Sequence, residues 1–201
     1  QTVGTAISIA RARKLSGELR LELNAGLFPV SVDLDRPAAF AEFQNPNLPA
    51  ERWGENDSHW DAMPDLEAAY RWAIGQGLPI VLWGSSYTAA LVFPLAAAQA
   101  ERVRTVLAFS PGEYLADRAV TRAAATLAMP VFISSATTLN EVAFAQPVFD
   151  AVGSAEKTYF LPKTGGAHGS LALIRSENPE GHEEVWAAVL GFLRRVIDQP
   201  A

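Results

Sequence analysis

The chain has 201 residues and is 49% hydrophobic, which is enough to bury a full core and predicts one domain over residues 1–201. Its formal net charge of -6 at pH 7 argues against non-specific nucleic-acid binding. Because the chain has no cysteine, disulfides, thiolate nucleophiles and cysteine-based metal sites are excluded.

Short apolar runs that favour β-strands alternate with helical patterns along the chain. The runs lie at 5–10, 29–34, 79–84, 105–110, 130–135 and 157–161. They are nearly continuous in hydrophobicity, as in parallel strands buried on both faces. The helical patterns lie at 16–26, 62–76, 87–101, 114–127, 141–153 and 181–197. This alternation predicts an α/β fold with a mostly parallel open sheet of about six strands and helices on both faces.

The run 79–84 leads directly into a candidate nucleophile. It ends at Gly84, and Ser85, Ser86 and small residues then open a helix. This is the layout of a nucleophile elbow, in which a tight turn exposes a serine at the carboxyl edge of the sheet. Ser86 is the candidate, although Thr88 stands where the G-x-S-x-G pattern has its last glycine, which predicts an adjusted turn. The alternative interpretation is a helix N-cap serine.

A histidine follows the last predicted strand and is the candidate general base. His168 lies in a glycine-rich loop, Gly165-Gly166-Ala167-His168-Gly169. A loop at the carboxyl edge of the sheet would let the imidazole reach Ser86, as a serine nucleophile requires. The alternative is a solvated loop histidine with no partner.

The acid and the oxyanion donors follow from their position in the chain. The loop after 130–135 contains no aspartate, and its first carboxylate is Glu141, which we select as the acid; the alternative interpretation is a glutamate that only complements a helix dipole. Glu113, after the preceding strand, is the alternative acid. For the oxyanion hole we expect the backbone N–H groups of Tyr87 and Arg11.

With these residues in place, the chain resembles the α/β-hydrolase superfamily and is most similar to its small dienelactone-hydrolase-like serine esterases. Residues 62–114, which include Phe109-Ser110-Pro111-Gly112-Glu113-Tyr114, carry the resemblance most strongly, followed by 166–170. The resemblance implies an ester or other acyl hydrolase without a metal or organic cofactor. It implies Ser86 as nucleophile, His168 as base and Glu141 as acid.

The chain departs from this family in two places near its beginning. Relatives usually carry His-Gln or His-Gly where this chain has Ala10-Arg11, which predicts weaker oxyanion geometry or substrate orientation. The early N-terminal strands of the full fold are missing from the expected order of elements, so that we expect an edge of the sheet that is open or covered by a partner.

The sequence therefore predicts a serine hydrolase that cleaves small or moderately sized carboxylic esters through an acyl-enzyme. The alternatives are a catalytically impaired hydrolase-fold binding protein and an acyltransferase or amidase with the same triad. The expected partner is a small-molecule ester, with no nucleic acid and no membrane span. The oligomeric state is not predicted. A secreted or periplasmic protein after signal cleavage and a cytoplasmic protein are equally compatible with a chain that begins at Gln1.

Overall fold

The structure is a computed structural model that describes residues 18–21, 30–33, 59–75 and 77–197. The chain divides into two compact units, residues 1–78 and 79–201. The single domain predicted from the sequence stays a prediction.

The first unit contains a pair of antiparallel strands. β1 (Glu18–Leu21) pairs with β2 (Val30–Asp33). The strand predicted at 29–34 is therefore confirmed, although its partner is an antiparallel strand. The helix predicted at 16–26 is wrong over β1, because pairing with β2 outweighs the helix propensity of its leucine, glutamate and arginine residues. The strand predicted at 5–10 lies outside the described residues.

A short 3-10 helix and an α-helix complete the described part of this unit. η3 (His59–Ala62) leads into α2 (Met63–Ile74), which confirms the helix predicted at 62–76. Pro64 lies at the beginning of α2 and Asp65 in its first turn, where a missing N–H and a negative charge are both favourable. One side of the helix is buried, through Leu66, Ala69, Tyr70 and Ala73.

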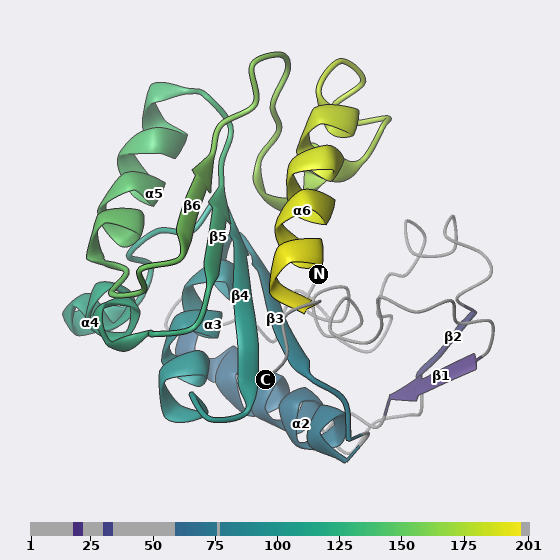
Figure 1. Cartoon of the computed structure of the whole chain (residues 1–201), viewed down its shortest axis with the longest axis vertical. Helices are drawn as coiled ribbons and strands as arrows, with labels where there is room; N and C mark the ends of the chain where they lie inside the picture. The colour runs from purple at the N-terminus through teal and green to yellow at the C-terminus, as the bar shows by residue number, and fades with distance from the viewer. Residues whose placement is uncertain (1–17, 22–29, 34–58, 76, 198–201) are drawn as a thin grey trace, which may run out of the picture. The chain divides into compact units, whose positions relative to one another are not determined.

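The second unit is built on a four-stranded parallel sheet with the strand order β3-β4-β5-β6 (Figure 1). Its strands are β3 (Ile80–Ser85), β4 (Val103–Phe109), β5 (Val131–Ser134) and β6 (Lys157–Phe160). They confirm the last four predicted strands. The described residues thus contain four parallel strands where the sequence predicted about six.

Helices connect the strands, as the alternating pattern predicted. They are α3 (Tyr87–Ala98), η4 (Ala116–Arg118), α4 (Ala119–Thr126), α5 (Leu139–Ala151), η5 (Gly169–Leu173) and α6 (His182–Ile197). In Figure 1, α6 lies on one side of the sheet, and α3, α4 and α5 lie on the other. The prediction of helices on both faces is confirmed for this sheet.

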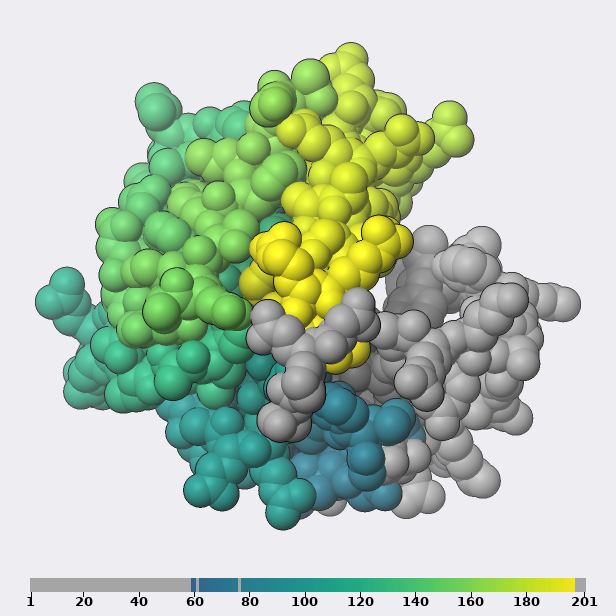
Figure 2. Space-filling model, viewed as in Figure 1, coloured from purple at the N-terminus to yellow at the C-terminus, as the bar shows by residue number. Residues whose placement is uncertain are grey.

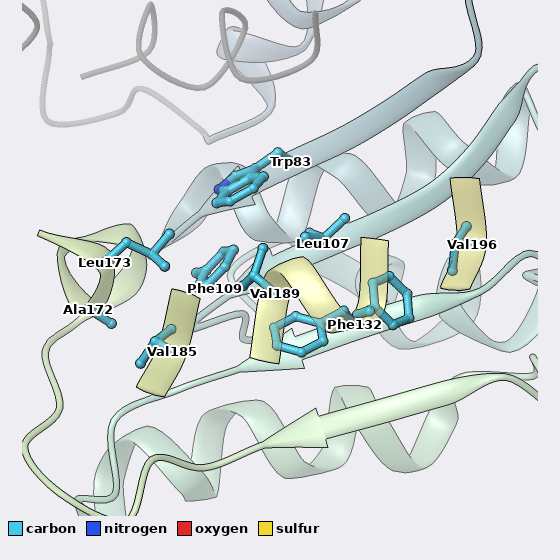
Figure 3. Packing of buried hydrophobic residues seen from close by; sticks show 10 residues of the cluster. Trp83, Leu107, Phe109, Phe132, Ala172, Leu173, Val185, Val189 and Val196 are labelled. Carbon is cyan, nitrogen blue, oxygen red and sulfur yellow. The ribbon is translucent and has the colours of Figure 1, made fainter. Parts of the chain in front are cut away.

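The core under α6 is rich in aromatic residues (Figure 3). Side chains alternate between the two faces of a strand, so Trp83, Phe109 and Phe132 point to the same face. The rings of Trp83 and Phe109 stack with centroids 4.9 Å apart, and Phe132 meets Phe192 of α6 at 5.3 Å. The opposite side of α6 is exposed and forms the yellow surface in Figure 2.

The opposite face of the sheet carries smaller aliphatic side chains. Leu82, Val106, Ala108 and Ile133 are fully buried there, and α3 contacts both β3 and β4. Removing apolar surface of this extent from water on both faces is the main contribution to stability that the sheet can make.

The strand register brings the carboxyl ends of the sheet together. Ser85 lies beside Phe109 of β4, and Phe109 lies beside Ser134 of β5. The residues that follow these strands, Ser86 and Ser110, therefore emerge at one edge, where ligands bind in open α/β sheets.

Candidate active site

Ser86 occupies a strained turn between β3 and α3. Its backbone has φ 57° and ψ -129°, a region that non-glycine residues rarely adopt and that is found most often at functional sites. Its N–H donates to the carbonyl of Phe109 at 2.9 Å, and its carbonyl accepts from the N–H of Ala89 at 2.9 Å. These two hydrogen bonds hold the turn against the neighbouring strand and the first turn of the helix.

Gly84 allows this turn to be tight. A Cβ at this position would lie 2.5 Å from both the Ala89 Cα and the Thr88 carbonyl oxygen. No real Cβ contact is that short, and both neighbours are backbone atoms. The strand and the helix can approach this closely only because residue 84 has no side chain.

Thr88 replaces the last glycine of the G-x-S-x-G pattern, and its side chain fits into the turn. Its side chain is buried, with 3% exposed. The hydroxyl donates to the Ser85 carbonyl at 2.7 Å and accepts from the Ser85 N–H at 3.0 Å. The expected adjustment of the turn is thus a local pair of hydrogen bonds that closes it.

The structure brings His168 between Ser86 and Glu141. Its Nε2 lies 2.8 Å from the Ser86 Oγ, and its Nδ1 is hydrogen-bonded to the Glu141 Oε1. A carboxylate can only accept, so the Nδ1 of the neutral ring carries the hydrogen and Nε2 is left as an acceptor for the serine hydroxyl. The path from carboxylate to imidazole to hydroxyl is continuous.

Glu141 is held in the first turn of α5. Its backbone N–H donates to the Oγ1 of the N-cap residue Thr138 at 3.4 Å. Only 19% of its side chain is exposed, against 47% for His168. Its second oxygen, Oε2, is buried and has no hydrogen-bond partner among the described residues.

The charge of Glu141 contributes to the raised pKa of two tyrosines. Burial raises the pKa of the Tyr114 hydroxyl, and the Glu141 carboxylate raises it further. Burial also raises the pKa of Tyr159; its hydrogen bond with Ser135 opposes that shift and Glu141 adds to it. Both phenols therefore keep their protons over the physiological pH range.

Glu113, the alternative acid, is engaged elsewhere. Its Oε1 accepts from the N–H of Val120 at 2.9 Å, and its Oε2 accepts from the N–H and the hydroxyl of Thr121, both at 2.9 Å. These donors belong to the first turn of α4, where a negative charge is favourable. The carboxylate that is hydrogen-bonded to His168 is therefore that of Glu141.

The expected oxyanion donors fall on different parts of the chain. Tyr87 is the first residue of α3 and directly follows Ser86, so its N–H lies at the positive end of the helix. Arg11 lies outside the described residues. The oxyanion hole stays a prediction.

Sequence reasoning missed the side chains that hold the His168 loop. Asn178 is 2% exposed, and its Oδ1 accepts from the N–H of Gly166 at 3.0 Å while its Nδ2 donates to the Ala172 carbonyl at 2.8 Å. Ser85 and Ser110 bind the same loop from the other side. Single side chains that bind backbone groups far away in the chain leave no periodic signal in a sequence.

Among the described residues, no group of three histidine, aspartate or glutamate side chains could hold a metal ion. Within those same ranges, no helix combines the length and the apolar character that crossing a bilayer requires.

No protein-family model and no curated protein matches the sequence. Solved structures do resemble it. A metagenome-derived lipolytic enzyme has a TM-score of 0.53 at 14% identity, over 69% of this chain and 74% of its own. The monoacylglycerol lipase of Paleococcus ferrophilus has a TM-score of 0.53 at 15% identity, over 68% and 75%. A cold-adapted esterase from an Arctic intertidal metagenomic library has 0.50 at 18%, over 73% and 62%.

These similarities concern the fold. The prediction and the structure share a parallel sheet flanked by helices. In both, a tight serine turn follows one strand and a histidine loop follows the last strand. The chain has the α/β-hydrolase type of fold seen in these lipases and esterases.

Proposed function

We propose that this protein is a carboxylic ester hydrolase that works through an acyl-enzyme on Ser86. One observation carries the proposal: the Ser86 hydroxyl lies 2.8 Å from the Nε2 of His168, whose Nδ1 is bound by Glu141. A nucleophile, a base and a group that orients the base are what acyl transfer by a serine requires. Their position at the carboxyl edge of the sheet supports the proposal.

In this mechanism, Ser86 Oγ attacks the ester carbonyl while its proton passes to His168 Nε2. The Glu141 carboxylate stabilises the imidazolium that forms. His168 then gives the proton to the departing alcohol as the bond from the carbonyl carbon to the alcohol oxygen breaks. Water enters, loses a proton to Nε2 and attacks the acyl-enzyme, and the acid is released as Ser86 recovers its proton.

Charge on the carbonyl oxygen would be stabilised by backbone donors. We assign one to the N–H of Tyr87 at the beginning of α3, where the helix dipole favours negative charge. We assign the second to the N–H of Arg11, from its place after the first predicted strand.

The substrate class is a finer part of the proposal. We propose a small or moderately sized soluble ester, with no metal or organic cofactor in the reaction. The names of the similar structures, a lipolytic enzyme, a monoacylglycerol lipase and an esterase, support ester substrates in general. The assignment to the dienelactone-hydrolase-like branch rests on the sequence resemblance over 62–114 and 166–170.

The test combines labelling with turnover. We expect a fluorophosphonate to label the protein and fragment-ion mass spectrometry to locate the adduct on Ser86 and not on its neighbour Ser85. p-Nitrophenyl acetate and butyrate should be hydrolysed, and Ser86→Ala should lower kcat by about 10³-fold or more. Ser154→Ala is the control, because the Ser154 hydroxyl also forms hydrogen bonds but binds Ala128 and Glu156 near the start of β6.

Full activity in Ser86→Ala would refute the assignment of the nucleophile. A folded wild-type protein that neither reacts with the fluorophosphonate nor hydrolyses the esters would instead indicate a non-catalytic binding protein on a hydrolase fold. Product analysis with a competing alcohol separates hydrolysis from transacylation, because only a transferase would give mainly the new ester.

A further inference from the structure

Two serines at the ends of adjacent strands face the loop that carries His168. Ser85 is the last residue of β3, and Ser110 follows Phe109, its neighbour in β4. Ser110 is 2% exposed and has φ 50°, and its N–H donates to the Ser134 carbonyl at 2.7 Å. That backbone bond holds the main chain from which the hydroxyl extends.

Each serine hydroxyl accepts a hydrogen bond from the loop backbone. The N–H of Gly169 donates to the Ser110 Oγ at 2.8 Å, and the N–H of Ser170 donates to the Ser85 Oγ at 2.8 Å. These are the two residues directly after His168. The indole N–H of Trp83 also donates to the Ser170 Oγ at 3.1 Å, which adds a third bond between the sheet and the loop.

The contact between loop and sheet is close as well as hydrogen-bonded. Gly169 has φ 63°, and a Cβ at this position would lie 2.3 Å from the Ser85 Oγ. Residue 169 is therefore a glycine for two reasons, its backbone conformation and the space that the Ser85 hydroxyl occupies.

We propose that Ser85 and Ser110 are positioning residues that fix the imidazole of His168 relative to Ser86. The proposal rests on the proposed function. The side chain of His168 is 47% exposed, against 19% for Glu141, so packing alone does not fix its position. Two consecutive amides bound to two strand ends fix the backbone from which the side chain extends.

This role predicts a specific kinetic signature. Both hydroxyls bind the loop, so they are not expected to contact the ester, and substrate binding should change little. Displacement of the base from the nucleophile lowers the rate of acyl transfer, and a shift of about 1 Å can cost about 100-fold. We therefore expect kcat to fall by about 10- to 100-fold in each variant, with KM within about 3-fold of wild type.

The experiment compares Ser85→Ala and Ser110→Gly with wild type and with Ser154→Ala. Glycine is used at position 110 because it accepts the positive φ of Ser110. We measure kcat and KM for p-nitrophenyl acetate, the urea midpoint of unfolding, and amide hydrogen exchange at Gly169 and Ser170 by NMR. Ser154 is a buried serine with several hydrogen bonds, so Ser154→Ala measures the general effect of losing one.

We expect faster exchange at Ser170 in Ser85→Ala and at Gly169 in Ser110→Gly, together with the loss of kcat, while Ser154→Ala changes neither. Unchanged kcat in both variants would overturn the proposal, as would an equal loss in Ser154→Ala at the same change in stability. If the wild-type protein is not an esterase, the proposed function fails by itself. Hydrogen exchange then still decides whether the two serines hold the loop, and unchanged exchange at both amides would overturn that part.

Discussion

Thr88 and Ser85 are joined by two hydrogen bonds through a single hydroxyl, which donates to the Ser85 carbonyl at 2.7 Å and accepts from the Ser85 N–H at 3.0 Å. We expect Thr88→Val, which keeps the shape and loses the hydroxyl, to destabilise the protein by about 1–3 kcal/mol, because it removes both hydrogen bonds from partly buried backbone groups of Ser85. Thr88→Ser should stay close to wild type. Urea unfolding measures the difference, and equal midpoints for the two variants would contradict the role of the hydroxyl.

Glu141, in the first turn of α5, and Glu113, whose carboxylate binds the first turn of α4, should respond differently to the same substitution. Glu141→Gln removes the charge that supports the imidazolium of His168, and we expect kcat/KM to fall by about 10³- to 10⁴-fold with p-nitrophenyl acetate. Glu113→Gln weakens the bonds to Val120 and Thr121. It should cost about 1 kcal/mol of stability and leave kcat within a few-fold of wild type.

Each variant is the control for the other, because each substitution removes one negative charge from beside the first turn of a helix. A loss of activity in Glu113→Gln as large as that in Glu141→Gln, at equal folding, would move the acid to Glu113.

Two glycines, one with no room for a side chain and one in open space, test how the serine turn contributes to stability. At Gly84 an added Cβ would meet backbone atoms of Thr88 and Ala89 at 2.5 Å, so Gly84→Ala should destabilise by about 1–3 kcal/mol or more. At Gly191 in α6 an added Cβ meets nothing within 4 Å. Gly191→Ala should therefore stabilise by about 0.5–1 kcal/mol through helix propensity.

Denaturant unfolding of the two alanine variants should give shifts of opposite sign. A Gly84→Ala protein as stable as wild type would mean that the strand and helix can separate at this point, and that the turn is not fixed by close approach.

The titration of Tyr114 and Tyr159 reports the charge on Glu141. Burial is the larger cause of both raised pKa values, and Glu141 adds to it, so Glu141→Gln should lower the pKa of both phenols part of the way towards the usual value. The ultraviolet absorbance of the phenolate measures this. Because the chain has four tyrosines, comparing Tyr114→Phe and Tyr159→Phe with wild type assigns the two signals. No change in either tyrosine would contradict the closeness of the carboxylate.

The same shifts have a consequence for stability at high pH. A folded phenol with a raised pKa keeps its proton after the unfolded chain has lost it, so stability falls as the pH rises above the ordinary tyrosine pKa of about 10 and towards the folded value. The slope should be smaller in Glu141→Gln, because the difference between folded and unfolded pKa is smaller there. Urea midpoints at several pH values test this.

Much of the second unit could be predicted from local patterns. β3, β4 and β5 are short, mostly apolar and buried runs, and buried parallel strands are apolar on both faces, so their hydrophobic pattern and their burial agree. Ser86 could be selected because it directly follows β3, and His168 because it lies in the loop after β6. β1 was missed because its pairing with β2 overrides the local helix propensity of leucine, glutamate and arginine.

The supporting groups of the site could not be predicted in this way. Ser110 and Asn178 act through hydrogen bonds to backbone amides, 59 and 12 residues away in the chain, and any residue can supply an amide. Which carboxylate contacts His168 also depended on what each one binds: Glu113 binds the first turn of α4, and Glu141 binds His168. Local patterns identify which strand end a residue follows, whereas three-dimensional contacts decide what its side chain binds.

The hydrogen bond between Ser86 and His168 joins residues 82 positions apart in the chain, with β4, β5 and β6 between them. Contacts of such long sequence separation form late, because the intervening loop must first lose its conformational freedom. Helices such as α3 and α6 can form locally before that point. During refolding, the return of ester hydrolysis should therefore lag behind the return of helical circular dichroism, since the reactive geometry belongs to the completed sheet and to no single segment of it.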